Sequence, residues 1–168
     1  MLNIVILAAG KGTRMHSDTP KVLHALAGAP LLQHVLDTAV SLKPSRTCVV
    51  YGHGGEAVPE AMVAYAASFV IQEPQLGTGH AVQQAMPQLQ DDSHTLVLYG
   101  DVPLIQATTL KQLLQTPDKL NLLTLRMDNP TGYGRIVRND AGKVISIVEE
   151  KDASPSQKAI CEVNTGIL

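Results

Sequence analysis

A short run of small and basic residues is the part of the sequence best suited to phosphate chemistry. It reads Leu-Ala-Ala-Gly-Lys-Gly-Thr-Arg-Met over residues 7–15, and Pro20 and Lys21 follow it. Glycine lacks a Cβ and tolerates positive φ, so the backbone N–H groups of such a loop can approach phosphate oxygens closely. Lys11, Arg14 and Lys21 can neutralise charge that develops on a departing pyrophosphate. The run therefore predicts a cradle for a triphosphate.

Spacing separates this run from two commoner glycine-rich loops. A Walker A loop needs Ser or Thr after its Gly-Lys pair, whereas Gly12 follows Lys11, and Val5 stands where the leading glycine belongs. A dinucleotide-binding loop needs a third glycine where Met15 stands. The glycines alone leave one further alternative open, a tight surface turn with scattered basic residues.

The elements that would hold this loop alternate between strand and helix. Apolar runs rich in Val, Ile and Leu cover residues 3–7, 47–51, 69–72, 95–99 and 122–127. They do not alternate apolar with polar residues, so we expect strands buried on both faces, as in a parallel sheet. Helical spacing covers residues 31–39, with Pro30 in the first turn, and residues 57–67, 80–89 and 110–114. This order predicts an α/β fold in which the loop borders the ligand crevice at the carboxyl ends of the strands.

The pattern changes after Met127. Residues 135–138 and 144–149 flank the turn signal Asn-Asp-Ala-Gly, which predicts a β-hairpin on or beside the main sheet. Another strand is expected within residues 162–168. The length of 168 residues suits one domain, and a chain that ends inside a strand suggests a domain incomplete at its C-terminus.

Composition argues against several classes of partner. A net charge of -2 and an aromatic content of 3% argue against a nucleic acid ligand. No apolar run approaches the roughly 20 residues of a membrane helix, and the N-terminus has no features of a secretion signal. Cys48 and Cys161 look like two reduced thiols, so we expect a cytoplasmic protein. The six histidines have no metal-ligand spacing.

The opening loop, together with the Pro-Lys pair, resembles the signature of the sugar-1-phosphate nucleotidyltransferases. Four later stretches are similar to one branch of that family, the N-acetylglucosamine-1-phosphate uridylyltransferase domain of bifunctional bacterial enzymes. They are Gln72 with residues 75–81, Tyr-Gly-Asp-Val-Pro-Leu at 99–104, Pro-Thr-Gly-Tyr-Gly-Arg at 130–135, and Glu149 with Glu-Val-Asn-Thr-Gly at 162–166.

The resemblance implies a Rossmann-like, three-layer α/β/α sandwich with a mostly parallel sheet and a hairpin insertion. It also implies an Mg²⁺-assisted reaction of UTP with N-acetylglucosamine 1-phosphate. The products would be pyrophosphate and UDP-N-acetylglucosamine, a precursor of peptidoglycan and lipopolysaccharide.

Site residues follow from the same resemblance. Arg14 and Lys21 match catalytic cations, and Asp101 matches the metal ligand, although an aspartate after a strand is also a common turn or helix cap. Thr78 could also be the N-cap of a helix that starts at Gly79. The residues that match nucleotide contacts are Leu7, Ala8, Ala9, Gly10, Lys21, Gln72, Gly77, Thr78, Tyr99, Gly100 and Asp101. Those that match sugar-phosphate contacts are Gly134, Glu149 and Asn164.

Two alternatives stay open on the sequence. The chain could serve another base or sugar, because the opening loop is shared across the superfamily. It could also bind nucleotide without turnover, because family members continue for about one further quarter of this domain, where an asparagine supplies a second metal ligand, and then into a left-handed β-helical acetyltransferase domain. Full-length members are homotrimers. Residues 1–168 are therefore expected to be an incomplete, monomeric uridylyltransferase domain.

Overall fold

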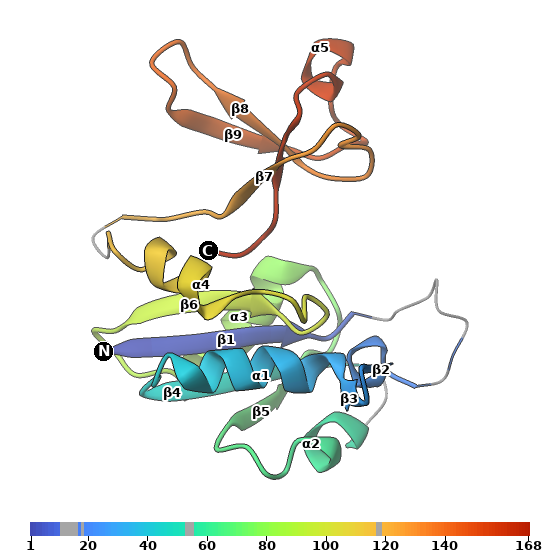
Figure 1. The fold of residues 1–168 in the computed structure, drawn as a ribbon, viewed down its shortest axis with the longest axis vertical. Helices are drawn as coiled ribbons and strands as arrows, with labels where there is room; N and C mark the ends of the chain where they lie inside the picture. Colours follow the sequence, from blue (N-terminus) through green and yellow to red (C-terminus); the bar gives the residue numbers. More distant parts are fainter. Residues whose placement is uncertain (11–16, 18, 53–55, 117–118) are drawn as a thin grey trace. The chain divides into compact units, whose positions relative to one another are not determined.

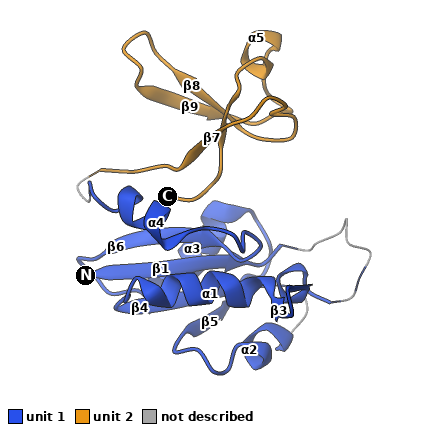
Figure 2. Ribbon diagram, viewed as in Figure 1, with its two compact units in different colours: residues 1–117 blue, residues 118–168 orange. Residues whose placement is uncertain are grey.

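The chain folds into two compact units, Met1–Pro117 and Asp118–Leu168 (Figure 2). The structure is a computed structural model that describes residues 1–10, 17, 19–52, 56–116 and 119–168. None of the helices within those ranges is long and apolar enough to cross a membrane.

The first unit is built on a parallel sheet with strand order β5-β4-β1-β6 (Figure 1). Its strands are β1 (Leu2–Ala8), β4 (Arg46–Tyr51), β5 (Ser68–Ile71) and β6 (His94–Tyr99). Val5 of β1 lies beside Cys48 on one neighbour and Val97 on the other, and all three side chains are at most 5% exposed. Continuous apolar runs suit these strands because both faces of the sheet are covered.

Helices cover the two faces of this sheet. α1 (Leu31–Ser41) lies on one face, and its buried residues Leu32, Val35, Leu36 and Ala39 recur at helical spacing (Figure 1). α3 (Thr78–Ala85) lies on the other face, where its two buried alanines pack in one cluster with Val5, Leu7, Cys48, Val50 and Val97. The remaining short elements are η2 (Lys21–Leu23), β2 (Ala25–Leu26), β3 (Ala29–Pro30), α2 (Ala57–Ala61), η3 (Met86–Gln88) and α4 (Ala107–Leu113). The expected three-layer α/β arrangement is confirmed for this unit.

Strand order determines where a ligand can enter. From β1 the chain moves outward through β4 to β5, and it then returns to place β6 on the opposite side of β1. The strand order therefore reverses between β1 and β6, which lie side by side in the sheet. In open α/β sheets this reversal opens the crevice that binds ligands.

The second unit is an antiparallel sheet with strand order β7-β10-β8-β9. It comprises β7 (Thr124–Arg126), β8 (Arg135–Arg138), β9 (Val144–Val148), α5 (Pro155–Lys158) and β10 (Glu162–Asn164). Arg135 is 1% exposed, and its guanidinium donates to the Glu150 carboxylate at 2.6 Å and to the backbone oxygen of Tyr133. This pairing gives the buried charge a partner, which a buried cation requires.

Several sequence-based predictions differ from the structure. The run 122–127 was expected in the parallel sheet, but its strand is β7 in the antiparallel sheet, with two of its three residues exposed. A short apolar run does not tell which sheet a strand joins. The helix expected over 57–67 ends at Ala61, α1 begins one residue after Pro30, and the last strand covers only Glu162–Asn164. The predicted hairpin is confirmed, and it pairs through β8 with β10.

Candidate nucleotide site

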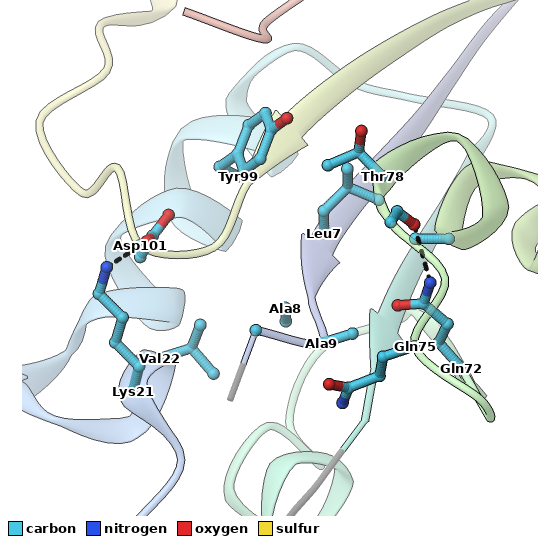
Figure 3. Close-up of a pocket in the computed structure, with 13 residues that line it drawn as sticks. Leu7, Ala8, Ala9, Lys21, Val22, Gln72, Gln75, Thr78, Tyr99 and Asp101 are labelled. Carbon is cyan, nitrogen blue, oxygen red and sulfur yellow. Dashed lines mark hydrogen bonds and ion pairs between the residues drawn. The ribbon is translucent and has the colours of Figure 1, made fainter. Parts of the chain in front are cut away.

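A pocket of about 350 Å³ lies in the first unit at the carboxyl ends of β1 and β6 (Figure 3). Its wall comes from the end of β1, from η2, from the segment after β5 with the start of α3, and from the end of β6. The lining residues are Leu7, Ala8, Ala9, Gly10, Lys21, Val22, Gln72, Gln75, Gly77, Thr78, Ala81, Tyr99 and Asp101. The pocket therefore lies where the strand order predicts a ligand crevice.

Close packing explains two glycines, Gly52 and Gly100, which directly follow the strands on either side of β1. A Cβ at Gly100 would lie 3.2 Å from side-chain carbons of both Leu32 and Val22. A Cβ at Gly52 would lie 3.0 Å from the backbone oxygen of Ala9 and 2.2 Å from the amide nitrogen of Gln75. Glycines at these two positions thus let the end of β1 and the Gln75 side chain lie directly on the neighbouring backbone.

An ion pair occupies one end of the pocket. Lys21 Nζ lies 2.6 Å from Asp101 Oδ2, and the two side chains are 41% and 29% exposed (Figure 3). A pair this exposed is screened by water and contributes at most about 1 kcal/mol to stability. The ion pair can therefore break, and Lys21 and Asp101 can each contact a ligand instead, at little cost in folding free energy.

The other end of the pocket holds an amide rather than charges. Gln72 is 4% exposed, and its Nε2 donates to the backbone oxygen of Gly77 at 2.8 Å. Gly77 has φ of 100°, and it is the N-cap residue of α3, which begins at Thr78. The expectation that Thr78 caps a helix starting at Gly79 is therefore wrong, because the turn is closed by the Gly77 carbonyl and the Gln72 side chain.

The structure brings most of the predicted nucleotide contacts together. Gly100 is the only one of that described set that does not line the pocket; it is buried behind it, where its N–H donates to the Leu7 oxygen at 2.9 Å. Arg14 lies outside the described residues. Val22, Gln75 and Ala81 line the pocket without having been predicted, although Gln75 and Ala81 stand within the quoted 75–81 motif.

The three predicted sugar-phosphate contacts lie side by side in the second unit. The Gly134 oxygen accepts from the Asn164 N–H at 2.8 Å. A Cβ at Gly134 would lie 3.0 Å from Glu149 Oε1, so the carboxylate lies over the glycine. The Asn164 Oδ1 accepts from the Gly166 N–H at 2.8 Å. The hairpin and β10 thus hold a carboxylate and an amide next to a residue with no side chain.

The described residues contain no group of three or more His, Cys, Asp and Glu side chains able to hold a metal ion by themselves. Asp101 is the only acidic residue among those that line the pocket in the described ranges. A cation bound there would need further oxygen ligands from a bound molecule or water, which is common for Mg²⁺.

Comparison with known proteins shows which family the chain belongs to. The family described as "MobA-like NTP transferase domain" matches residues 4–136, which include every residue of the pocket. The chain belongs to this family of NTP transferases.

Individual relatives of this NTP transferase are also similar along the whole chain. Proteins named "Bifunctional protein GlmU" from Herminiimonas arsenicoxydans and Thiobacillus denitrificans are 62% and 64% identical over 169 residues. The alignments cover 99% of this chain, which spans 37% of the length of either relative. Among solved structures, a putative glucose-1-phosphate thymidylyltransferase from Bacillus anthracis matches 99% of this chain and 70% of its own, with a TM-score of 0.77 and 19% identity. That likeness concerns the fold alone.

Proposed function

We propose that this NTP transferase transfers UMP from UTP to N-acetylglucosamine 1-phosphate, with UDP-N-acetylglucosamine and pyrophosphate as products. The observation that carries the proposal is the division of one pocket into two chemically different ends. Lys21 and Asp101 offer charge at one end, and Gln72 with the Gly77 backbone offers amide hydrogen bonding at the other. A nucleoside triphosphate has the matching halves, a polyanion and a base with polar edges.

The base would lie at the Gln72 end of the pocket. A buried amide and a glycine backbone suit a flat heterocycle because neither blocks its approach, and each offers a hydrogen bond. Thr78 and Ala81 supply the first residues of α3 beside it. Leu7, Ala8, Ala9 and Gly10 would carry the ribose and the first phosphates along the exit of β1.

The reaction would be a direct displacement at phosphorus. A phosphate oxygen of the sugar 1-phosphate attacks the α-phosphorus in line, a new P–O bond forms, and the bond to the β-phosphate oxygen breaks. Pyrophosphate leaves with that electron pair. The attacking oxygen is already an anion, so no general base is needed, and the protein's contribution is positioning and charge stabilisation. Lys21, which lines the pocket, would stabilise the charge on the departing pyrophosphate, and Arg14 is the second cation proposed for this role.

Asp101 would hold the Mg²⁺ ion. Its carboxylate faces the pocket and is a hard oxygen ligand, which fits this ion. When bound, the ion withdraws charge from phosphate oxygens and holds them in place. Lys21 would then exchange its contact with Asp101 for the phosphates. In the second unit, Gly134, Glu149 and Asn164 are the proposed contacts to the acetamido sugar phosphate.

A substrate panel tests the proposal. Pyrophosphate release is measured for UTP, CTP, TTP and GTP, each with N-acetylglucosamine 1-phosphate, glucose 1-phosphate and glucosamine 1-phosphate. We expect the pair of UTP with N-acetylglucosamine 1-phosphate to give the highest kcat/KM. A higher kcat/KM for another base or sugar would instead assign the chain to a different sugar nucleotidyltransferase.

Substitutions at the charged end test the roles of its residues. Lys21→Ala and Asp101→Asn are each expected to lower kcat by about 100-fold or more, because each removes charge stabilisation in the transition state. Unfolding free energy should change by less than about 1 kcal/mol, since the pair is exposed. Lys111→Ala in α4 removes an exposed lysine away from the pocket and serves as the control. Turnover unchanged from the wild type in either pocket variant would contradict the assigned role.

A second candidate function is nucleotide binding with little turnover. It is favoured by the single carboxylate at the described pocket, because an Mg²⁺ ion held by one protein ligand is weakly fixed. Calorimetric titration with UTP and Mg²⁺, run beside the turnover assay on the same sample, separates the two. Binding without pyrophosphate release supports this second function.

A further inference from the structure

Three side chains form a hydrogen-bonded chain that begins at the pocket and runs along α3. Gln72 Nε2 lies 3.1 Å from His80 Nδ1, and His80 Nε2 lies 3.1 Å from Gln84 Nε2. His80 and Gln84 are four residues apart, so they lie on the same side of α3. Of the three, only Gln72 lines the pocket.

The Gly77 carbonyl fixes the direction of this chain. A carbonyl oxygen can only accept, so the atom of Gln72 that lies 2.8 Å from it must be the amide NH₂ group. The same NH₂ group faces His80 Nδ1, which must then be the accepting nitrogen of a neutral ring. His80 Nε2 consequently carries the hydrogen. The structure places Gln84 Nε2 opposite it, and because two donors cannot bond, the Gln84 amide must be turned by 180° so that its oxygen accepts. Each partner has one allowed role.

One consequence falls on the pocket. With both hydrogens of its NH₂ group engaged, Gln72 keeps only its oxygen for a ligand. Figure 3 shows that oxygen on the pocket side of the amide, away from the bond to the Gly77 carbonyl. A flipped Gln72 amide would set its oxygen against the carbonyl oxygen of Gly77. That oxygen could then gain a hydrogen bond from His80 only if the ring carried a hydrogen on Nδ1.

We propose that His80 is a positioning residue that holds the Gln72 oxygen toward the pocket. That oxygen then favours a base whose facing ring nitrogen carries a hydrogen over a base whose facing ring nitrogen carries a lone pair. This inference rests on the proposed function. Uracil and thymine carry a hydrogen on ring nitrogen 3, whereas cytosine has an acceptor there. At a residue that is 4% exposed, two facing acceptors leave polar groups without partners, which is costly.

The test compares variants by their preference for UTP over CTP. His80→Leu removes the accepting nitrogen. His80→Asn keeps an acceptor, because Asn Oδ1 is bonded to Cγ as Nδ1 is. Gln84→Leu leaves the ring in place and removes only its outer partner. The measured quantity is the ratio of kcat/KM for UTP to that for CTP, with the ratio of dissociation constants from titration as a second readout.

We expect His80→Leu to lower the UTP:CTP ratio about 10-fold, the effect of one lost hydrogen bond. His80→Asn should retain most of the wild-type ratio, and Gln84→Leu should lower it by a smaller factor. Loss of packing alone would weaken both nucleotides equally and leave the ratio unchanged. An unchanged ratio in His80→Leu therefore overturns the inference, and if that variant does not fold, an unchanged ratio in Gln84→Leu does so.

The proposed function can fail separately. A wild type that shows no preference for UTP over CTP overturns the proposed function and the role of His80 together. A wild type that prefers UTP, with His80→Leu preferring it as strongly, overturns the role of His80 alone.

Discussion

At the scale of single residues, Gly77 is required for its backbone and not for the space around it. Its φ of 100° and ψ of 179° belong to a region that only glycine adopts readily. A Cβ at this position would meet nothing within 4 Å. This conformation turns the Gly77 carbonyl toward both Gln72 and the first turn of α3, where it accepts from the Ala81 N–H at 3.1 Å.

Replacing this glycine separates backbone strain from steric crowding. We expect Gly77→Ala to lower the free energy of unfolding by about 1 to 3 kcal/mol and to weaken UTP binding. Gly79→Ala is the matched control, because Gly79 also has open space around its Cβ position but lies within α3. It should be neutral or stabilising by up to about 1 kcal/mol. Urea unfolding and UTP titration measure both quantities, and equal losses in the two variants would contradict the argument.

The sequence predicts part of the site because motif residues follow strands directly. Gln72 and Asp101 could be found that way, and Lys21 could be found from the Pro-Lys pair that follows the opening loop. Gly52 could not be found that way. Only glycine fits there because Gln75 and Ala9 lie against it, and they do so only in the folded protein. His80 stands in the quoted motif, but its hydrogen bond to Gln72 depends on how α3 packs beside β5.

At the scale of elements, the predictable strands are those whose surroundings are uniform. β1, β4 and β6 are apolar over most of their length, since helices cover both faces of the sheet, and their predicted positions are confirmed to within one residue. β7 and β10 have three residues each, too few to show a pattern that distinguishes a parallel from an antiparallel sheet. α2 contains Pro59, and its helical spacing continues beyond Ala61 into residues that do not form a helix.

An ion pair links two strands of the second unit. Arg138 at the end of β8 donates to both carboxylate oxygens of Glu162 in β10, at 2.8 and 2.7 Å. These hydrogen bonds lower the pKa of Glu162 from 4.5 to about 2. A carboxyl group with a lowered pKa stabilises the folded state above its unfolded pKa, and it loses that contribution as the pH falls toward its folded pKa.

This pair predicts a loss of stability in acid. The protection of β8 and β10 backbone amides in hydrogen exchange, corrected for intrinsic rates, should decrease between about pH 4.5 and pH 2. Glu162→Gln should lower protection at pH 7 by up to about 1 kcal/mol, because Arg138 is partly exposed and the pair is screened, and should flatten the pH dependence. Glu60→Gln, an exposed change in α2, is the control. A wild-type protection that stays constant with pH would contradict the prediction.

At the scale of the whole molecule, the pocket residues belong entirely to the first unit, while the proposed sugar-phosphate contacts belong to the second. A nucleotide that binds the folded pocket stabilises the unit that carries it by mass action. At a nucleotide concentration 100 times the dissociation constant, that stabilisation is about 2.7 kcal/mol.

The positions of the two cysteines give each unit its own chemical reporter. Cys48 is fully buried in β4, where burial raises the pKa of its thiol, and Cys161 is partly exposed beside β10. A thiol reagent should therefore modify Cys161 quickly and Cys48 only when the first unit opens. UTP with Mg²⁺ should slow modification of Cys48 by about 10-fold or more and leave Cys161 unchanged, as peptide mass spectrometry would show. Equal slowing at both thiols would mean that the two units open together. Because each unit carries its own cysteine, the opening of each can be followed without adding any label to the chain.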